Sequence, residues 1–520
     1  MSRIARAASL VMVLFVISRA LGLLREVVVA RQFGTSADMD AYVAAFSLPD
    51  FLFYVVAGGA LGSAFIPVFA GYLTRGDMPG AWRLASAIIN WIVLLLSILA
   101  GLLSIAAPWL VGWLFGDLSP AQQILTTELM RWMLISTVIF GVSGVVMGIL
   151  NAQHHFFLPA AAPIIYNLSI IMGAWFLGPI IGVRGLAVGV VVGAAGHLLV
   201  QLPGLRWGKE RMTYQATFAV RSRSLYEVGR LMAPRVLGLA AVQLNFIVTR
   251  VLAAGLAVGS ITALYYGWII MLLPQGIIAQ SVATALFPTL AALAAQEDYA
   301  EMRHIFATTL KSMLFLTLPA AVGLIVLAQP LIRLLLERGE FNAESTALTA
   351  WALSFFALGL IGHAVVEIAV RAFYALKNTK TPVGIGVLAM AINIALSILL
   401  MRLFVVWGLP AHSGLALANS IAVTLEMIVL MVLLRTEMGG LSETSLWPSL
   451  GKMMFATVGM AVVLLIARPF LPDTPSWLGG VIGVGMGGLV YGGLAYFIGA
   501  DELKPIQEKA VRIWQKVRRS

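Results

Sequence analysis

Long apolar segments alternate with short polar loops along almost the whole chain. A bilayer core of about 30 Å is crossed by about 20 residues of helix, so apolar runs of this length predict membrane-spanning helices. We therefore predict an all-α polytopic membrane protein, in which the longer segments tilt or extend beyond the bilayer. About fourteen segments qualify, at residues 8–30, 39–73, 82–112, 121–151, 158–180, 184–205, 222–254, 261–295, 303–328, 345–374, 382–406, 413–436, 447–470 and 475–499.

Composition supports this interpretation. Of the 520 residues, 60% are hydrophobic and only 11% are charged, which a soluble chain of this length could not accommodate. The absence of cysteine excludes disulfides, thiolate metal sites and cysteine nucleophiles. No small-residue cleavage site follows the first apolar run, so we expect a retained first span rather than a signal peptide.

The net charge of +11 is concentrated in alternate loops and at the C-terminus. Arg75 and Arg83 follow the second apolar segment, several arginines lie between residues 206 and 230, and Lys377 and Lys380 follow the tenth segment. This distribution is typical of the positive-inside rule and predicts an even number of spans, with both termini cytoplasmic. It also favours contact with anionic membrane lipids over binding of nucleic acid.

A weak internal repeat indicates the domain organisation. Residues 151–189 resemble residues 374–419, and an even number of helices separates the two stretches. This spacing predicts two pseudo-symmetric six-helix lobes in the same orientation, with a transport cavity at their interface. The expected parts are an N-terminal lobe (1–205), a basic cytoplasmic linker (206–221), a C-terminal lobe (222–436), two additional transmembrane helices (437–499) and a basic cytoplasmic tail (500–520).

Two arginines lie within the first apolar segment, Arg19 and Arg25. An arginine at membrane depth costs at least about 2.5–3.5 kcal/mol, so it usually faces a partner or a water-filled cavity. The two lie about 120° apart around a helix and could line one broad cavity that binds phosphate through guanidinium groups. The alternative for Arg25 is a position at the membrane interface, or a structural pair with Glu26 or a nearby aspartate.

Proline, glycine and an acid interrupt the second apolar segment. Asp50 follows Pro49 and is expected to face the cavity, to balance an arginine or to cap a helix break. Gly58 and Gly59 follow soon after, and we interpret them as hinge residues. Pro274 and Gly276 mark a similar break in the second half, where a moving hinge and a static kink remain alternatives.

Other charged residues lie in later spans. Arg235 and Arg250 lie in the seventh segment and are further candidates for substrate binding. Glu367 can pair with Arg371 one turn later on the same helix face. Glu426 stands alone in the twelfth segment, and we regard Glu367 and Glu426 as candidates for ion coupling.

No catalytic motif occurs in the chain. It contains no H-E-x-x-H zinc motif, no P-loop and no G-x-S-x-G nucleophile motif. We therefore expect a transporter rather than an enzyme, without a metal or an organic cofactor. Its energy would come from the substrate gradient, the membrane potential, or a gradient of Na⁺ or H⁺.

Several motifs resemble one known family. SRALGLLREVVVARQFG (18–34), DAYVAAFSLPDFL (40–52) and GGALGSAFIPVF (58–69) are similar to the N-terminal signature of the MurJ/MviN-type lipid II flippases. The likeness continues through ILNAQHHFFLPAAAPIIYN (149–167), ATALFPTL (283–290), LLERGEFNAEST (335–346) and RAFYALKNTKTPV (371–383).

The resemblance implies the fold of the multidrug/oligosaccharidyl-lipid/polysaccharide exporters, with two extra helices that form a groove for a lipid tail. It also implies alternating-access transport of the undecaprenyl-diphosphate-linked peptidoglycan precursor (lipid II) across the bacterial plasma (inner) membrane. The cell-wall synthesis machinery is then a candidate partner.

The family motifs also assign roles to individual residues. Arg19 and Arg25 match arginines associated with the diphosphate-sugar site, and Asp40 matches an acid that opens the second helix. Asp50 stands where the family often has asparagine. We therefore expect all four, together with Arg235 and Arg250, to contribute to substrate binding.

The chain departs from the family pattern at several charged positions. Phe53 and Tyr54 stand where relatives have arginines, and Trp268 and Ile269 stand where they have a basic residue. Acids expected near Leu272 and at Gly58 are also missing. Either Arg235 or Arg250 compensates, or the substrate differs.

Two alternatives to lipid II transport follow from these departures. One is an exporter of another lipid-linked oligosaccharide or amphiphile. The other is a non-transporting membrane scaffold of the same fold.

Overall fold

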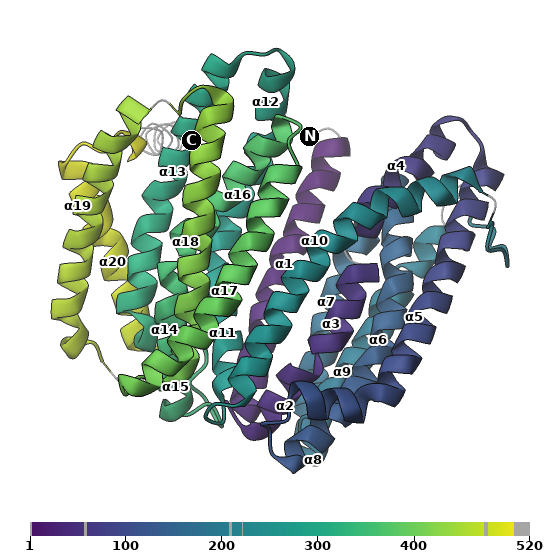
Figure 1. The fold of residues 1–520 in the computed structure, drawn as a ribbon, viewed down its shortest axis with the longest axis horizontal. Helices are drawn as coiled ribbons and strands as arrows, with labels where there is room; N and C mark the ends of the chain where they lie inside the picture. The colour runs from purple at the N-terminus through teal and green to yellow at the C-terminus, as the bar shows by residue number, and fades with distance from the viewer. Residues whose placement is uncertain are drawn as a thin grey trace, which may run out of the picture. The chain divides into compact units, whose positions relative to one another are not determined.

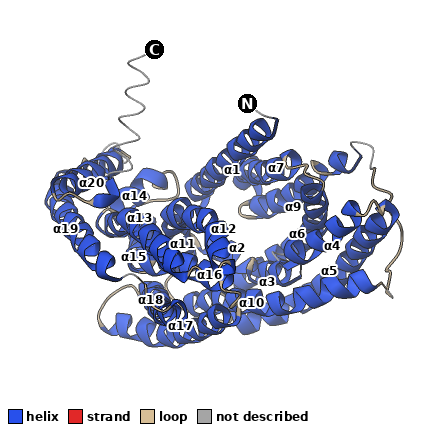
Figure 2. Ribbon diagram, turned by 90° about the horizontal axis from the view of Figure 1, so that it is seen from above, coloured by secondary structure: helices blue, strands red, loops and turns tan. Residues whose placement is uncertain are grey.

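The computed structural model describes residues 3–56, 60–206, 211–220, 222–441, 443–472 and 477–503. Over these ranges the chain forms helices and connecting loops, and no strand is present (Figure 2). By length and composition, eleven helices could cross a membrane, and the number rises to thirteen if two bent helix pairs each count as one span. The remaining predicted segment is α1 (Arg3–Phe33), a helix of 31 residues. The prediction of an all-α polytopic fold is confirmed.

The helices group into two compact units. The first comprises residues 1–262 and 338–342, and the second comprises residues 263–337 and 343–520. The helices of the first unit (Figure 1) are α1, α2 (Ala37–Ala45), α3 (Ser47–Val56), α4 (Ala60–Thr74), α5 (Met78–Leu114), α6 (Pro120–Ala152), α7 (Phe157–Met172), α8 (Gly178–Ile181), α9 (Arg184–Leu199) and α10 (Arg223–Ala254).

Local sequence explains where these helices begin. Ser36 caps α2 by accepting a hydrogen bond from the Met39 amide, and Ser119 forms a capping box with Gln122 at the start of α6. The predicted segment 39–73 is divided into α2, α3 and α4, with Pro49 in the first turn of α3. Proline is tolerated there because the amides of a first helical turn have no partner within the helix.

The helix α10 packs against α3 and α4 and clusters with the first unit. The sequence analysis placed residues 222–254 in the C-terminal lobe, so the observed grouping differs from that division. The unit to which α10 belongs depends on its tertiary contacts. The hydrophobic pattern of the segment does not show which helices it will contact. The same contacts bring Arg250 close to Ser47 and Asp50 of α3.

The basic linker is held against α5 where the structure describes it, at residues 211–220. The Asn90 amide donates to the Thr217 carbonyl at 2.7 Å, and the Tyr214 hydroxyl donates to Asn90 at 2.6 Å. The Trp91 indole donates to the Phe218 carbonyl at 3.0 Å. This part of the linker is therefore packed against the helix over residues 214–218.

The C-terminal end of α1 meets a loop that comes from far along the sequence. The Glu340 amide donates to the Arg31 carbonyl at 2.9 Å, and the Phe341 ring is fully buried. Gly34 and Gly339 both have positive φ angles, of 58° and 59°. A Cβ atom on Gly339 would lie 2.4 Å from the Arg31 carbonyl oxygen, so this contact requires glycine.

The second unit begins within α11 (Ser260–Gln275) and contains the remaining helices: α12 (Ser281–Ala295), α13 (Tyr299–Val326), α14 (Ala328–Leu335), α15 (Ala343–Leu358), α16 (Leu360–Ala375), α17 (Lys380–Val406), α18 (Ala411–Met438), α19 (Glu443–Ala467) and α20 (Leu478–Phe497). The Tyr491 hydroxyl of α20 donates to the Phe315 carbonyl of α13 at 2.7 Å. Gly480 lets α20 approach α14, because a Cβ there would lie 2.7 Å from Leu334.

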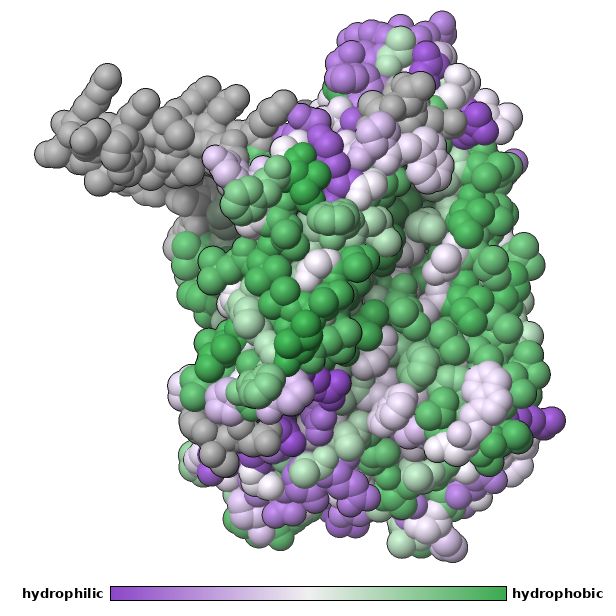
Figure 3. All heavy atoms as spheres, turned by 90° about the vertical axis from the view of Figure 1, so that its left-hand side faces the viewer, coloured by the Kyte–Doolittle hydropathy of each residue, from purple (hydrophilic) through white to green (hydrophobic). Residues whose placement is uncertain are grey.

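Apolar side chains cover much of the outer surface of this second unit. Figure 3 shows the face that carries α19 and α20, where hydrophobic atoms form a wide region between more hydrophilic ends. Phe455, Ile466 and Leu489 are exposed by 65%, 65% and 79%. A contiguous apolar surface of this kind is typical of helices in contact with lipid.

Candidate functional site

Arg25 is the best-anchored charged residue of α1. Its guanidinium pairs with the carboxylate of Glu26, and its Nη1 donates to Asn167 Oδ1 of α7 at 3.1 Å. Ser18 and Gly22 lie on the same helix face as Arg25 and also approach Asn167. The structural pair that the sequence analysis kept as an alternative for Arg25 is therefore present.

A second ion pair lies between α3 and α10. Arg250 Nη2 is 3.7 Å from Asp50 Oδ2, and Arg250 Nη1 donates to the Ser47 hydroxyl at 3.2 Å. The side chains of Arg250 and Asp50 are exposed by 19% and 34%. Of the roles considered for Asp50, balancing an arginine is the one that the structure shows.

Tyr166 connects the two ion pairs. It is next to Asn167, the partner of Arg25, and its ring contacts Phe140, which in turn contacts Phe53 of α3. We call the set of Arg25, Glu26, Asp50, Tyr54, Tyr166, Asn167 and Arg250 the Tyr166 cluster. It joins α1, α3, α7 and α10 within the first unit.

Aromatic rings connect the two sides of this cluster. Phe53 contacts Tyr54 and Phe140 with ring centroids 5.4 and 5.8 Å apart, and Phe140 contacts Tyr166 at 5.1 Å. The rings of Phe53 and Tyr54 thus occupy the part of α3 where the family pattern led us to expect arginines. Tyr166 and Asn167 were not among the predicted site residues, although both end the motif at 149–167 and an asparagine within a span was a usable signal.

The cluster is charge-balanced, since it contains two arginines and two carboxylates. The sequence analysis predicted a phosphate-binding cavity lined by Arg19 and Arg25. In the fold Arg25 is paired with Glu26, which is the alternative that the sequence analysis kept for it. Arg19 differs, because its side chain is exposed and makes no hydrogen bond or ion pair with the described part of the chain.

Asp40 has a structural role. It is 3% exposed, and its carboxylate accepts hydrogen bonds from the Gly259 amide at 2.6 Å, the Thr262 amide at 2.8 Å and the Thr262 hydroxyl at 2.6 Å. These contacts cap the start of α11 and satisfy amides that have no partner within the helix. Both carboxylate oxygens of Asp40 are therefore engaged, and contact with a substrate stays a prediction.

Three predicted residues fall on parts of the chain that the structure does not describe. Gly58 and Gly59, predicted as hinge residues, lie outside the described residues. Arg235 lies in α10, but its side chain is outside the described part of the structure. Their proposed roles stay predictions.

The predicted break in the second half coincides with an irregular helix. Pro274 lies near the end of α11, and the wider π-helical turn Gly276–Gln280 follows directly before α12. Proline removes a backbone donor and clashes with the preceding turn, which explains the irregularity. Motion at this point stays a prediction.

The two acids proposed for ion coupling have different surroundings. Glu367 pairs with Arg371 at 2.9 Å, as their four-residue spacing predicted. The carboxylate of Glu426 lies against α17, where a Cβ on Gly386 would be 3.4 Å away, and the described residues give it no hydrogen bond. Among those residues, no group of three or more His, Asp or Glu side chains could hold a metal ion.

Trp268 has aromatic partners within the second unit. Its ring lies 5.4 Å from both Phe356 and His363, and His363 is hydrogen-bonded to Asn419 at 3.1 Å. The position where the family pattern led us to expect a cation is again part of an aromatic contact.

Comparison with known proteins decides the family. The model of the family described as "Lipid II flippase MurJ" matches residues 29–476. This chain belongs to the lipid II flippase MurJ family.

The MurJ family relatives align over most of their length. A probable lipid II flippase MurJ of Rhizobium tropici is 31% identical over 425 residues, which cover 80% of this chain and 78% of the relative. One of Vibrio cholerae serotype O1 is 29% identical and covers 82% of each chain. Arg19 and Arg25 precede the residues matched by the family model, whereas Asp50 and Arg250 lie within them.

Solved structures of a MurJ flippase and of a MATE family transporter share the fold. A lipid II flippase MurJ in an inward closed conformation is 27% identical, with a TM-score of 0.77 over 95% of this chain and 100% of that chain. A multidrug resistance MATE family transporter of the MOP superfamily, 17% identical, has a TM-score of 0.69 over 82% of this chain and 96% of that chain. The second likeness concerns the fold alone.

Proposed function

We propose that this member of the MurJ family is a flippase that moves lipid II from the cytoplasmic to the outer face of the bacterial plasma membrane, by alternating access, for cell-wall synthesis. The observation that carries the proposal is the family match over residues 29–476, together with relatives named as lipid II flippases that align over about 80% of the chain. The assembled lipid-linked precursor would then reach the cell-wall synthesis machinery outside the membrane.

The diphosphate of the substrate would bind to arginines of α1 and α10. Arg19 is exposed and has no carboxylate partner in the described structure, so its charge is not neutralised. Arg250 is held by a 3.7 Å contact with Asp50, which is longer than a typical charge-assisted hydrogen bond, so a diphosphate can replace the aspartate as its partner. Arg25 would act mainly by positioning α1 against α7 through Asn167.

This arrangement favours compensation by Arg250 over a different substrate. Arg250 reaches Ser47 and Asp50 on α3, and Tyr54 lies one turn beyond Asp50 on the same helix. A cation supplied by α10 therefore approaches the segment where the family pattern led us to expect a cation from α3 itself.

Transport without ATP hydrolysis requires another source of energy, and we propose coupling to the membrane potential or to a Na⁺ or H⁺ gradient. Glu426 is the better candidate for the coupling acid, because Glu367 already has Arg371 as its partner. Both termini would lie in the cytoplasm.

A second candidate is the export of another lipid-linked oligosaccharide. It is favoured by the aromatic residues Phe53, Tyr54 and Trp268 at positions where the family pattern led us to expect cations, and by the charge balance of the Tyr166 cluster.

Complementation of a bacterium depleted of its own flippase tests the proposal. We expect the wild type to restore growth, Arg19→Ala to fail, and Arg25→Ala to be weakened, with membrane expression of each variant confirmed by immunoblot. Arg402→Gln is the matched control, because Arg402 is an exposed arginine of α17 outside the cluster. Failure of a well-expressed wild type, or rescue by Arg19→Ala equal to wild type, would contradict the proposed site.

A further inference from the structure

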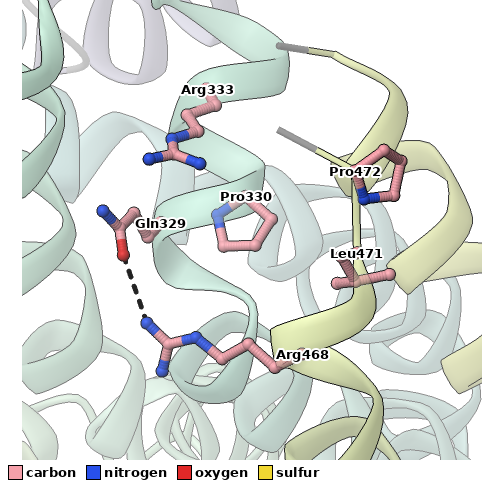
Figure 4. A pocket seen from close by; sticks show the side chains of 7 residues that line it. Gln329, Pro330, Arg333, Arg468, Leu471 and Pro472 are labelled. Atoms are coloured by element: carbon pink, nitrogen blue, oxygen red, sulfur yellow. Dashed lines mark hydrogen bonds between the residues drawn. The ribbon is translucent and has the colours of Figure 1, made fainter. Parts of the chain in front are cut away.

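A cavity of about 230 Å³ lies in the second unit between α14 and the connection from α19 to α20. The polar part of its lining is formed by Gln329 and Arg333 of α14 and by Arg468 at the end of α19. Figure 4 shows these three side chains on the same side of the cavity, while Pro330, Leu471 and Pro472 form an apolar border. The described lining contains two arginines and no acidic residue.

The polar groups of the cavity are ordered by specific contacts. Arg468 Nη2 donates to Gln329 Oε1 at 3.2 Å, which joins α19 to α14. Arg333 Nε lies 3.5 Å from Glu337, and the Glu337 carboxylate also accepts from the Thr346 hydroxyl. Among the described residues, Glu337 is therefore the acid beside Arg333, and Arg468 is hydrogen-bonded to a neutral amide.

The residues around the cavity are of the kinds found where a protein meets the surface of a membrane. It lies where two apolar helices end, and Phe470 and Trp477 beside it are exposed by 83% and 46%. Aromatic side chains concentrate at the interface between the acyl chains and the headgroups. Ile466 and Val481, exposed by 65% and 48%, continue this apolar surface along α19 and α20.

From this juxtaposition we propose that the cavity binds the phosphate of an anionic phospholipid whose acyl chains lie along α19 and α20. Guanidinium groups bind phosphate oxygens through paired hydrogen bonds, and basic pockets between membrane helices are suited to anionic headgroups. The volume greatly exceeds the roughly 30 Å³ of a water molecule, which leaves room for a phosphate group. Under the proposed topology the site faces the outer leaflet, and it is separate from the Tyr166 cluster of the first unit.

Native mass spectrometry of the delipidated full chain tests this assignment. The protein is titrated with phosphatidylglycerol and, separately, with phosphatidylcholine of the same acyl chains. We expect tighter binding of phosphatidylglycerol, and about a tenfold or greater loss of that preference in Arg333→Gln/Arg468→Gln. Arg402→Gln, an exposed arginine predicted to lie near the same end of the second unit, should bind as the wild type does.

Further measurements distinguish binding of a lipid from binding of free phosphate. Arg468→Gln alone is a second variant, because this exposed side chain can be replaced with little effect on folding. It should weaken phosphatidylglycerol binding while the thermal transition stays unchanged. Equal binding of both lipids, an equal loss in Arg402→Gln, or displacement of the lipid by inorganic phosphate at the same concentration would overturn the proposal. So would Arg333→Gln/Arg468→Gln if it lost lipid II binding but kept its preference for phosphatidylglycerol.

Discussion

At the scale of single residues, the arginines of the Tyr166 cluster are each paired with an acid. Arg25 has Glu26, and Arg250 has Asp50, while Asp40 is engaged by amides of α11. A charged group in a span is costly unless it is paired or solvated, and this explains why acids accompany the arginines. Substrate binding at the cluster then requires that one of these ion pairs separates, so that its arginine can bind the substrate.

The pair of Asp50 and Arg250 gives a prediction with opposite outcomes for its two members. Arg250→Gln removes the cation that approaches α3, so we expect transport to fall by at least about tenfold, as expected when a charge-assisted contact is lost. Asp50→Asn frees Arg250 and should keep at least wild-type transport. Growth rates of complemented cells, normalised to membrane expression, measure both. Equal loss in the two variants would indicate a purely structural ion pair.

At the scale of helices, the hydrophobic pattern predicted which segments form helices. It predicted less well which helices contact one another. All fourteen apolar segments correspond to one helix or to a series of consecutive helices, because about 20 apolar residues have few alternatives in a membrane. The grouping of α10 with the first unit, the cap that Asp40 provides for α11 and the role of Asn167 depend on residues distant in sequence. A single sequence contains no direct signal for such contacts, and it therefore could not show that the cluster is charge-balanced.

The junction between α1 and the loop at 338–342 provides a prediction at this scale. Gly339→Ala places a methyl group against the Arg31 carbonyl, in addition to the cost of a positive φ angle, which is about 1–2 kcal/mol for an L-residue. Gly76→Ala is the control, because Gly76 also has a positive φ angle, of 71°, but a Cβ there meets nothing within 4 Å. We expect Gly339→Ala to lower the apparent Tm in detergent clearly more than Gly76→Ala. Similar shifts would show that the loop adjusts without loss.

At the scale of the whole molecule, the proposal requires a defined orientation in the membrane. The even number of predicted spans and the basic loops place residues 75–77 inside and residues 406–410 outside. The natural absence of cysteine makes this directly measurable, because any introduced cysteine is the only thiol of the chain.

Labelling of single cysteines in intact cells measures the orientation. Val406 is 80% exposed at the end of α17, so Val406→Cys should react with a membrane-impermeant maleimide. Arg75→Cys, exposed in the loop before α5, should react only after the cells are opened. The reverse pattern would place the N-terminus outside and contradict the proposed direction of transport.

Reconstitution of the purified chain into vesicles with fluorescent lipid II tests the central claim most directly. The account predicts that lipid II in the inner leaflet becomes accessible to an external quencher at a rate well above that of protein-free vesicles. Arg19→Ala/Arg250→Gln, reconstituted at the same protein density, should fall to the protein-free rate. A wild type no faster than protein-free vesicles, or a double variant as fast as the wild type, would contradict the account.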